Sequence, residues 1–164
     1  MTNVILLGDS YTGKSSWLHR LKGYKFTNTY IATMGKDTSL LKYNDRQVII
    51  HDMGGQERFH TVVESYYTIA DGAIIFFDAS TEGRVDYWRN KLPKGIPCVV
   101  YGNKRDLLDD GYLDWVDVLS CKKDLVVTAP LDELLDQIPY LESAETTFLG
   151  WVWEIVVYYL SAPI

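Results

Sequence analysis

The stretch that most constrains the fold begins at Gly8 and reads Gly-Asp-Ser-Tyr-Thr-Gly-Lys-Ser-Ser. It follows the apolar run Val4–Leu7, which has the length and composition of a buried strand. Helical spacing begins at Lys14 and continues to about Leu21. The pattern Gly-x-x-x-x-Gly-Lys-Ser between a strand and a helix is typical of a loop that wraps a phosphate. Taken alone, the stretch has an alternative interpretation as a Gly-rich turn before a helix.

The residue types of this loop suit phosphate chemistry. Glycines let the backbone bend so that its N–H groups converge on phosphate oxygens, and Lys14 would neutralise the β and γ oxygens. The hydroxyl of Ser15 is a suitable ligand for Mg²⁺. The loop therefore predicts a nucleotide phosphate site.

Short apolar runs alternate with segments of helical spacing along the whole chain. This alternation predicts a mostly parallel sheet with helices on both faces. Two strand-like runs flank Asn44 and Asp45 and predict a hairpin, which gives the sheet one antiparallel edge. The apolar runs are Val4–Leu7, Val48–Ile50, Ala73–Phe77, Cys98–Tyr101 and Leu125–Val127. The expected helices are Lys14–Leu21, Thr61–Ile69, Val85–Leu92, Leu113–Lys123 and Ser143–Leu160, with a further short helix at Leu131–Asp136 as an option.

Length and charge restrict the class of protein. The chain has 164 residues, which suits a single domain over residues 1–164. Its net charge of -6 disfavours nucleic acid and anionic lipid as partners, because such surfaces need an excess of Lys and Arg. Cys98 and Cys121 form no Cys-x-x-Cys pair, so a reducing, cytoplasmic compartment fits. We recognise no signal peptide, membrane span or prenylatable cysteine, and expect no direct lipid anchor.

A second polar stretch, Asp52–Glu57, follows the strand that ends at Ile50. A carboxylate at a strand end can hold Mg²⁺ through water, a glycine N–H can meet a γ-phosphate, and a glutamine can orient water for in-line attack. Taken alone, this stretch is a Gly-Gly turn with solvated polar residues. Its position behind the phosphate loop favours such roles for Asp52, Gly55 and Gln56.

A third stretch, Asn103–Asp106, closes the strand Cys98–Tyr101. A carboxylate at Asp106 can accept both the N1–H and the exocyclic amine of guanine, a pair of donors that adenine does not offer in that arrangement. An Asn-Lys-x-Asp turn is weak evidence by itself, because Asn and Asp are common in loops. Because this turn follows the phosphate loop and the Asp52–Glu57 stretch along the chain, it indicates a site for guanine rather than adenine. It therefore disfavours a P-loop kinase or an ATPase.

With these motifs in this order, the sequence resembles the small GTPases of the Ras superfamily over about residues 3–127. The resemblance implies an α/β fold, the P-loop NTPase G domain. Its six-stranded, mostly parallel sheet has one antiparallel edge strand and five helices on both faces. Residues 56–59 and 65–67 are similar to the Rab branch, whereas residues 30–35, 88–92 and 96–97 are similar to the Ran branch.

The resemblance also implies GTP or GDP as the ligand and Mg²⁺ as the cofactor. Thr33 matches the threonine of the first switch, whose hydroxyl reaches Mg²⁺ and whose N–H reaches the γ-phosphate, and Gln56 matches the glutamine that positions water. Phe26 is similar to the aromatic that packs edge-on to guanine, and Tyr30 to the tyrosine that closes over the phosphates; the alternative is that both simply pack. The implied catalytic residues are Gln56, Lys14 and Thr33, and the implied metal ligands are Ser15, Thr33 and Asp52. The implied nucleotide contacts are Ser10, Tyr11, Thr12, Gly13, Lys14, Ser15, Ser16, Phe26, Tyr30, Thr33, Gly55, Asn103, Lys104, Asp106, Thr128 and Ala129.

Thr128 and Ala129 enter through the fifth family motif, Ser-Ala-Lys, which supports guanine with a backbone N–H. The best match after a strand is Thr128-Ala129-Pro130, which lacks the lysine, so base affinity is expected to be reduced. Ser143-Ala144-Glu145 matches by its letters but falls at the start of an expected helix.

Three further positions depart from the family pattern. His51 stands where members usually have tryptophan, and Thr38 stands where many have a bulky apolar residue. Both positions lie on the surface that effectors read, so the partners are expected to differ from those of Rab and Ran. Tyr11 is unusual because its ring would block the phosphate cradle and its backbone position often has a positive φ. We expect its ring to point outward, either as a lid that slows nucleotide exchange or excludes a partner's arginine, or without any role.

The leading interpretation is a guanine-nucleotide switch with slow Mg²⁺-dependent hydrolysis that regulates transport or trafficking. Its partners would be an exchange factor, a GTPase-activating protein and effectors that read residues 25–38 and 52–68. We expect a monomer in the cytoplasm, with the nucleus as a further location. The alternative is a degenerate GTPase-like decoy, such as a viral or parasite mimic, that binds regulators with little or no hydrolysis. The intact catalytic residues favour the switch, and the departures favour the decoy.

Overall fold

The computed structural model describes residues 1–56, 58, 60–81, 83–108, 119–124 and 127–139. Within these residues the strands are β1 (Thr2–Leu7), β2 (Lys36–Tyr43), β3 (Arg46–Met53), β4 (Gly72–Asp78) and β5 (Cys98–Asn103). The helices are α1 (Lys14–Leu21), α2 (His60–Tyr66), α3 (Val85–Lys91) and α4 (Ala129–Gln137), with a turn of 3-10 helix, η2, at Arg105–Leu107.

The strands form one sheet in the order β2-β3-β1-β4-β5. β1 runs parallel to both β3 and β4, and β5 runs parallel to β4, whereas β2 is antiparallel to β3. The prediction of a mostly parallel sheet with one antiparallel edge is therefore confirmed. The described residues contribute five strands rather than the expected six. Residues 125–126 of the expected strand Leu125–Val127 lie outside the described residues.

The β2–β3 hairpin turns at Asn44 and Asp45, which have φ values of 45° and 61°. Two successive positive φ angles give a turn whose twist matches the twist of the flanking strands, and Asn and Asp tolerate them best after glycine. The predicted hairpin is thus present, with its turn at the predicted residues.

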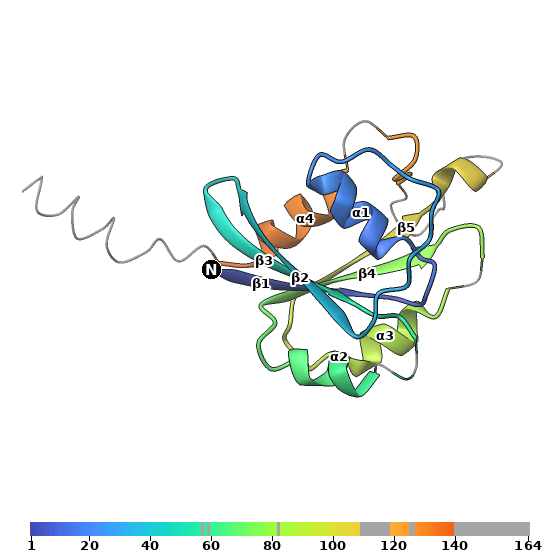
Figure 1. The fold of residues 1–164 in the computed structure, drawn as a ribbon. Coiled ribbons are helices and arrows are strands. Elements are labelled where there is room, and N and C mark those ends of the chain that lie inside the picture. The colour runs from blue at the N-terminus through green and yellow to red at the C-terminus, as the bar shows by residue number, and fades with distance from the viewer. Residues whose placement is uncertain (57, 59, 82, 109–118, 125–126, 140–164) are drawn as a thin grey trace, which may run out of the picture.

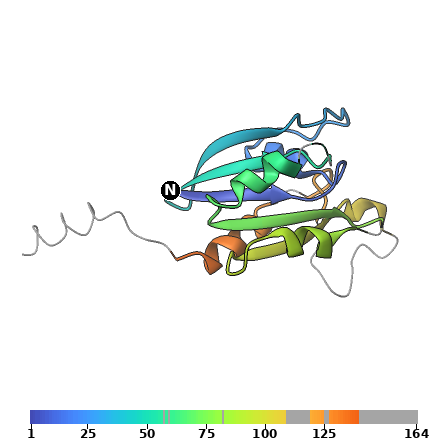
Figure 2. The ribbon, with the colours of Figure 1, turned by 90° about the horizontal axis from the view of Figure 1, so that it is seen from below.

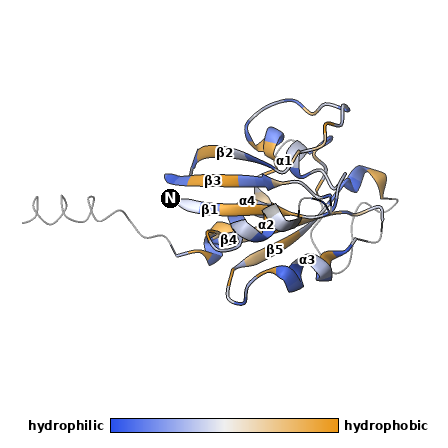
Figure 3. Cartoon of the chain, turned by 60° about the horizontal axis from the view of Figure 1, so that its bottom comes forward, coloured by the Kyte–Doolittle hydropathy of each residue, from blue (hydrophilic) through white to orange (hydrophobic). Residues whose placement is uncertain are grey.

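Helices cover both faces of the sheet, as Figures 1 and 2 show: α1 and α4 lie on one face, and α2 and α3 lie on the other. β1 shows how one strand serves two cores. Val4 and Leu6 pack under α1 and α4, whereas Ile5 and Leu7 pack under α2 and α3. All four side chains are at most 1% exposed. The stretch of a strand that is buried on both faces is apolar, as Figure 3 shows for the middle of β1.

The helix α4 completes the core on the α1 side. Leu131 and Leu134 are fully buried there. The phenol of Tyr43 on β2 donates a hydrogen bond to Asp132 at 2.7 Å. Arg46 on β3 donates to the carbonyls of Leu135 and Ile138 at 2.9 and 3.1 Å, which satisfies acceptors at the end of the helix. These contacts explain why so short a helix is stable in this position.

Most predicted helices are confirmed, with shifts of a few residues at their ends. The predicted helices Lys14–Leu21, Thr61–Ile69 and Val85–Leu92 correspond to α1, α2 and α3. The optional helix at Leu131–Asp136 corresponds to α4. The prediction of a helix over Leu113–Lys123 is wrong where the structure describes it, because Cys121–Lys123 form a turn. The expected helix Ser143–Leu160 lies outside the described residues. No described helix has both the length and the apolar character that a membrane crossing requires.

Replacing the buried Leu134 tests whether α4 belongs to the core. Leu134→Ala is expected to lower the free energy of unfolding by about 2–5 kcal/mol, because it removes a fully buried side chain and leaves a cavity. Leu40→Ala on β2 is the matched control, since Leu40 is 62% exposed, and it should change the free energy by about 0.5 kcal/mol or less. Urea unfolding followed by circular dichroism measures both. Equal effects of the two variants would contradict the packing of α4.

Candidate functional site

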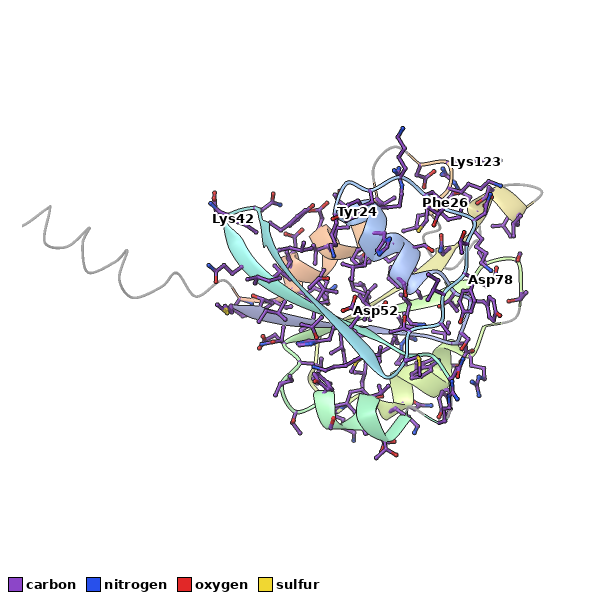
Figure 4. The ribbon with its side chains drawn as sticks, in the orientation of Figure 1. Tyr24, Phe26, Lys42, Asp52, Asp78 and Lys123 are labelled. Carbon is purple, nitrogen blue, oxygen red and sulfur yellow. The ribbon has the colours of Figure 1, made fainter. Side chains whose placement is uncertain are left out.

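The candidate site lies where the parallel strands β1, β3, β4 and β5 reach their carboxyl ends. Ligands bind at this edge in open α/β sheets, because the loops that leave the strands converge there. The phosphate loop leaves β1, Asp52 lies near the end of β3, and Asp78 and Asn103 end β4 and β5. Figure 4 shows Asp78 at this edge and Lys42, beside the β2–β3 turn, at the opposite end of the sheet.

Lys14 begins α1 and is almost completely buried under the phosphate loop. Its Nζ donates hydrogen bonds to the carbonyl oxygens of Gly8 and Asp9, both at 2.8 Å. Burial lowers the pKa of Lys14 to about 8, although the charges of Asp52 and Asp9 act in the opposite direction. A buried ammonium group that is stabilised by few charges favours an anion beside it. The loop is thus built to accept a phosphate.

Two glycines allow the loops of the site to approach one another. A Cβ at Gly13, whose φ is 87°, would lie 2.0 Å from Nδ2 of Asn103. A Cβ at Gly55 would lie 2.4 Å from the carbonyl carbon of Asp9 and 2.5 Å from the backbone nitrogen of Ser10. A side chain at either position would collide with these atoms, so the phosphate loop lies directly against Asn103 at the end of β5 and Gly55 after β3.

The predicted metal ligands lie together. The hydroxyl of Ser15 donates to Oδ2 of Asp52 at 2.5 Å. Oγ1 of Thr33, from the loop between α1 and β2, lies 2.9 Å from Oγ of Ser15 and 3.3 Å from Oδ2 of Asp52. Among the residues that the structure describes, the other carboxylate oxygen, Oδ1 of Asp52, is buried and has no hydrogen-bond partner. Burial raises the pKa of Asp52, while the hydrogen bond from Ser15 and the charge of Lys14 oppose this change.

These oxygens fit Mg²⁺. Magnesium takes oxygen ligands and commonly binds through one or two carboxylates together with phosphate oxygens and water. A buried oxygen with no partner among the described residues calls for an explanation, and a bound cation would give Oδ1 of Asp52 a partner. The two hydroxyls and the carboxylate come from α1, the loop before β2, and β3.

Hydrogen bonds join the turn Asn103–Asp106 to the phosphate loop and to the segment that contains Ser120 and Cys121. Nδ2 of Asn103 donates to the carbonyl oxygen of Thr12 at 3.0 Å, and Oδ1 of Asn103 accepts from the backbone N–H of Cys121 at 3.3 Å. The hydroxyl of Ser120 donates to Oδ1 of Asp106 at 2.5 Å. Lys104 forms an ion pair with Asp78 at 2.6 Å.

Ser120 and Cys121 therefore occupy the place expected for Thr128 and Ala129. Thr128 precedes α4, and its side chain lies beside that of Tyr43 on β2, at the opposite edge of the sheet from β5. Ala129 is the first residue of α4. The structure does not bring either of them to Asp106.

The sequence carried a signal for this segment, the letters Ser-Cys-Lys at residues 120–122, close to the pattern Ser-Ala-Lys. The prediction of a helix across these residues concealed it. The backbone turns instead because Asp124 accepts from the N–H of Ser120 at 2.8 Å, and the Ser120 hydroxyl accepts from the N–H of Lys123 at 3.1 Å. Such local bonds from Ser and Asp compete with helix formation.

The structure also describes the remaining predicted residues. Ser16 lies in the first turn of α1, and Gln56 is half-buried directly after Gly55. Phe26 is partly buried against the core under α1, on the loop where Figure 4 labels it. The rings of Tyr11 and Tyr30 are stacked, with centroids 3.9 Å apart.

Two links tie the loops of the site to their neighbours. The backbone N–H of Gly54 donates to the carbonyl oxygen of Gly35 at 2.8 Å, which joins the segments before β2 and after β3. Asp9 was not predicted as a site residue, yet it accepts hydrogen bonds from Arg84 at 2.7 Å and from Nε1 of Trp88 at 3.1 Å. Although burial acts to raise the pKa of Asp9, these bonds from Arg84 and Trp88 lower it overall. The phosphate loop is thereby fixed to α3.

A row of polar side chains crosses the strands on the α2 side. Nδ1 of His51 lies 3.3 Å from Oγ1 of Thr38, and Nε2 of His51 lies 3.2 Å from Oδ1 of Asn3. The ring of His51 also contacts Tyr66 of α2, with centroids 5.0 Å apart. Burial lowers the pKa of His51, and the charge of Lys36 acts in the same direction. We call Asn3, His51 and Thr38 the polar row.

Comparison with known proteins agrees with this geometry. Residues 3–106 match a family model described as Roc, Ras of Complex, Roc, domain of DAPkinase. That span includes the phosphate loop, Asp52 and the turn that ends at Asp106. The chain belongs to the Ras-like family of small GTPase domains.

Individual relatives place this small GTPase on the Rab branch. The Ras-related protein Rab-7a of Dictyostelium discoideum is 38% identical over 122 residues, which cover 65% of this chain and 60% of the relative. Rab7 of Drosophila melanogaster is 36% identical, with coverages of 65% and 59%. The GTP-binding protein ypt1 of Schizosaccharomyces pombe is 32% identical over 123 residues, with coverages of 68% and 61%.

The chain thus spans about 60% of the length of these relatives. They are Rab and Ypt proteins, and they do not support the Ran-like assignment or the nuclear location that accompanied it. The segments similar to Ran are short, whereas the match to the Rab relatives extends over more than a hundred residues, which carries more weight.

The buried His51 predicts that the small GTPase loses stability in mild acid. The pKa of His51 is lowered from 6.5 in the folded state, so the unfolded chain binds more protons at pH values between the two pKa values. The melting temperature should therefore fall as the pH drops below about 6.5. His51→Gln should flatten this decrease, measured from about pH 8 to about pH 5, because glutamine does not titrate.

His19→Gln is the control for this measurement, since His19 is exposed on α1. It should keep the wild-type pH dependence. If His51→Gln shows the same slope as wild type, His51 does not contribute to the acid sensitivity and the prediction is contradicted.

Proposed function

We propose that this small GTPase is a cytoplasmic, monomeric Rab-like switch that binds GTP and GDP with Mg²⁺ and hydrolyses GTP slowly. One observation carries the proposal: side-chain oxygens of Ser15, Thr33 and Asp52, from three separate segments, lie within 3.3 Å of one another, and the other carboxylate oxygen of Asp52 is buried with no partner among the described residues. A purely structural role for these residues leaves that oxygen unexplained.

Each residue at the phosphate end has a distinct task. Lys14 neutralises phosphate oxygens with an ammonium group that the loop already holds beneath it. Ser15, Thr33 and Asp52 would hold Mg²⁺, which would supply positive charge to offset the charge of the phosphates. Gln56, directly after Gly55, orients the attacking water through its side-chain amide.

The base end is built around Asp106. Its carboxylate accepts the N1–H and the exocyclic amine of guanine, and the hydrogen bond from Ser120 fixes its orientation. Asn103 couples this end to the phosphate end, since it contacts both Thr12 and Cys121. Adenine offers no matching pair of donors to Asp106, which gives selectivity for guanine.

Switching would act through the loops that carry Thr33 and Gly55. Both lie at the phosphate end, and the hydrogen bond between Gly35 and Gly54 joins them. Loss of the γ-phosphate removes a partner from both loops at once, so the surface they form would differ between GTP and GDP states. An exchange factor, a GTPase-activating protein and effectors in trafficking would read residues 25–38 and 52–68.

The polar row favours one alternative, an interaction protein that holds regulators with little hydrolysis. Its members His51 and Thr38 stand where the resemblance implies a tryptophan and a bulky apolar residue. Thr38 is exposed on β2, so the set of partners that read this surface would be altered. The two functions differ in whether bound GTP is converted to GDP.

A titration with fluorescent GDP, GTP and ADP tests nucleotide binding on protein stripped of nucleotide. Guanine nucleotides should bind at least about a hundredfold more tightly than ADP, and more tightly with Mg²⁺ than without it. Lys14→Met should lose at least about a hundredfold in affinity for GDP, because it removes a buried cation beside the phosphates. Equal binding of ADP and GDP, or no effect of Lys14→Met, would contradict the proposal.

A pair of variants tests which segment supports the base. Ser120→Ala should weaken GDP binding about tenfold, because Asp106 loses the hydrogen bond that orients it. Thr128→Val should stay within about twofold of wild type, since Thr128 lies beside Tyr43. Fluorescent GDP displacement measures both affinities. A larger loss of affinity in Thr128→Val than in Ser120→Ala would indicate that Thr128 and Ala129, and not Ser120 and Cys121, support the guanine base.

A further inference from the structure

The stack between Tyr11 and Tyr30 joins two loops of the site. The ring centroids are 3.9 Å apart and the planes are inclined by 19°. Tyr11 belongs to the phosphate loop between β1 and α1, and Tyr30 belongs to the loop between α1 and β2. The side chains are 62% and 46% exposed, so the contact is not part of the hydrophobic core. A parallel stack of two exposed rings therefore needs an explanation other than core packing.

The backbone of Tyr11 adds a second observation. Its φ is 66°, in the left-handed region that costs an aromatic residue conformational energy and costs glycine none. Strained backbone persists where the surrounding structure determines it, and it concentrates at functional sites. Here the strained residue is one whose ring contacts the opposite loop of the same site.

The two rings are attached to supports of different kinds. The phosphate loop is held by the bonds of Lys14 to Gly8 and Asp9, and by the bonds of Asp9 to α3. Residues 24–35 form neither helix nor strand, and backbone hydrogen bonds hold this loop at its two ends, at Tyr24 and at Gly35. Between these ends, side-chain contacts position it. Thr33 fixes one point of this loop at the metal ligands, and Tyr30 fixes another, three residues earlier, on Tyr11.

We propose that the Tyr11–Tyr30 stack is a clasp that fastens the first switch loop to the phosphate loop and slows the release of bound guanine nucleotide. The inference rests on the proposed function, because the stack can slow the release of nucleotide only if nucleotide binds between these loops. Release of the nucleotide requires the loop that carries Tyr30 and Thr33 to separate from the phosphate loop that carries Tyr11. The stack must break for that separation, so it adds to the barrier for release.

Nucleotide release from four proteins tests the clasp: wild type, Tyr11→Leu, Tyr30→Leu and the double variant. Fluorescent GDP is preloaded and then chased with excess unlabelled GDP. Each single variant should release GDP about threefold to tenfold faster, the range that the energy of one aromatic pair implies. The double variant should be no faster than the faster single variant, because both substitutions remove the same contact. Leucine retains a Cβ, so it does not free the backbone at position 11 as glycine would.

Two matched variants separate stacking from other effects of substitution. Tyr11→Phe should retain slow release, because phenylalanine preserves the ring. Tyr24→Leu removes another exposed tyrosine of the same loop, whose ring lies beside His19, and should leave release unchanged. In hydrogen exchange, amides of residues 24–35 should exchange faster in Tyr11→Leu than in wild type.

The outcomes distinguish the clasp from the proposed function. If wild type binds guanine nucleotide but all variants release it at the wild-type rate, the clasp is overturned and the switch stands. Rate increases that multiply in the double variant would also overturn it, since the two rings would then act independently. If wild type binds no guanine nucleotide, the proposed function is wrong, and the clasp, which depends on it, is overturned as well.

Discussion

The buried charges of Lys14 and Asp52 set the requirements for the rest of the site. Each charge is costly away from water unless partners surround it. Backbone carbonyls of the phosphate loop accept from Lys14, and the hydroxyls of Ser15 and Thr33 lie against Asp52. Parallel pairing of β1 with β3 is what brings the two residues to one edge of the sheet. The loops, glycines and helix ends around them follow from this placement.

The partners of these charges also link the two ends of the site. Thr12, within the phosphate loop, offers its carbonyl oxygen to Asn103, and Asn103 in turn contacts the segment that orients Asp106. The side chain of Asn103 at the end of β5 therefore holds the phosphate loop beside the turn that carries Asp106, which would keep the proposed phosphate and base sites at a fixed separation. A shift in one strand would be felt at both ends, because protein interiors are packed too densely to absorb it.

Much of this arrangement could be predicted from the sequence, because local pattern determines it. The run Val4–Leu7, the loop after it and the helix from Lys14 carry three independent signals for the same unit, and the structure contains that unit. The Asn44–Asp45 turn has a local signal of the same kind, two residues that tolerate positive φ.

What escaped prediction depends on contacts distant in sequence. Ser120 reaches Asp106 only because local polar bonds turn the chain where helical spacing was expected. The polar row needs the register of β2, β3 and β1 to bring Thr38, His51 and Asn3 into line. The positive φ and the exposed ring of Tyr11 agree with the expectation from the sequence, but its stack on Tyr30 joins two separate loops, and a single sequence does not specify that contact.

Single-turnover hydrolysis of GTP with Mg²⁺, by wild type and Gln56→Leu, tests the central claim most directly. A working switch predicts slow conversion of bound GTP to GDP by wild type. Gln56→Leu, which cannot orient water, should be slower by about tenfold or more. Tight binding of GTP by wild type without any formation of GDP, even with a GTPase-activating protein, would contradict the switch and would identify a protein that only binds its partners.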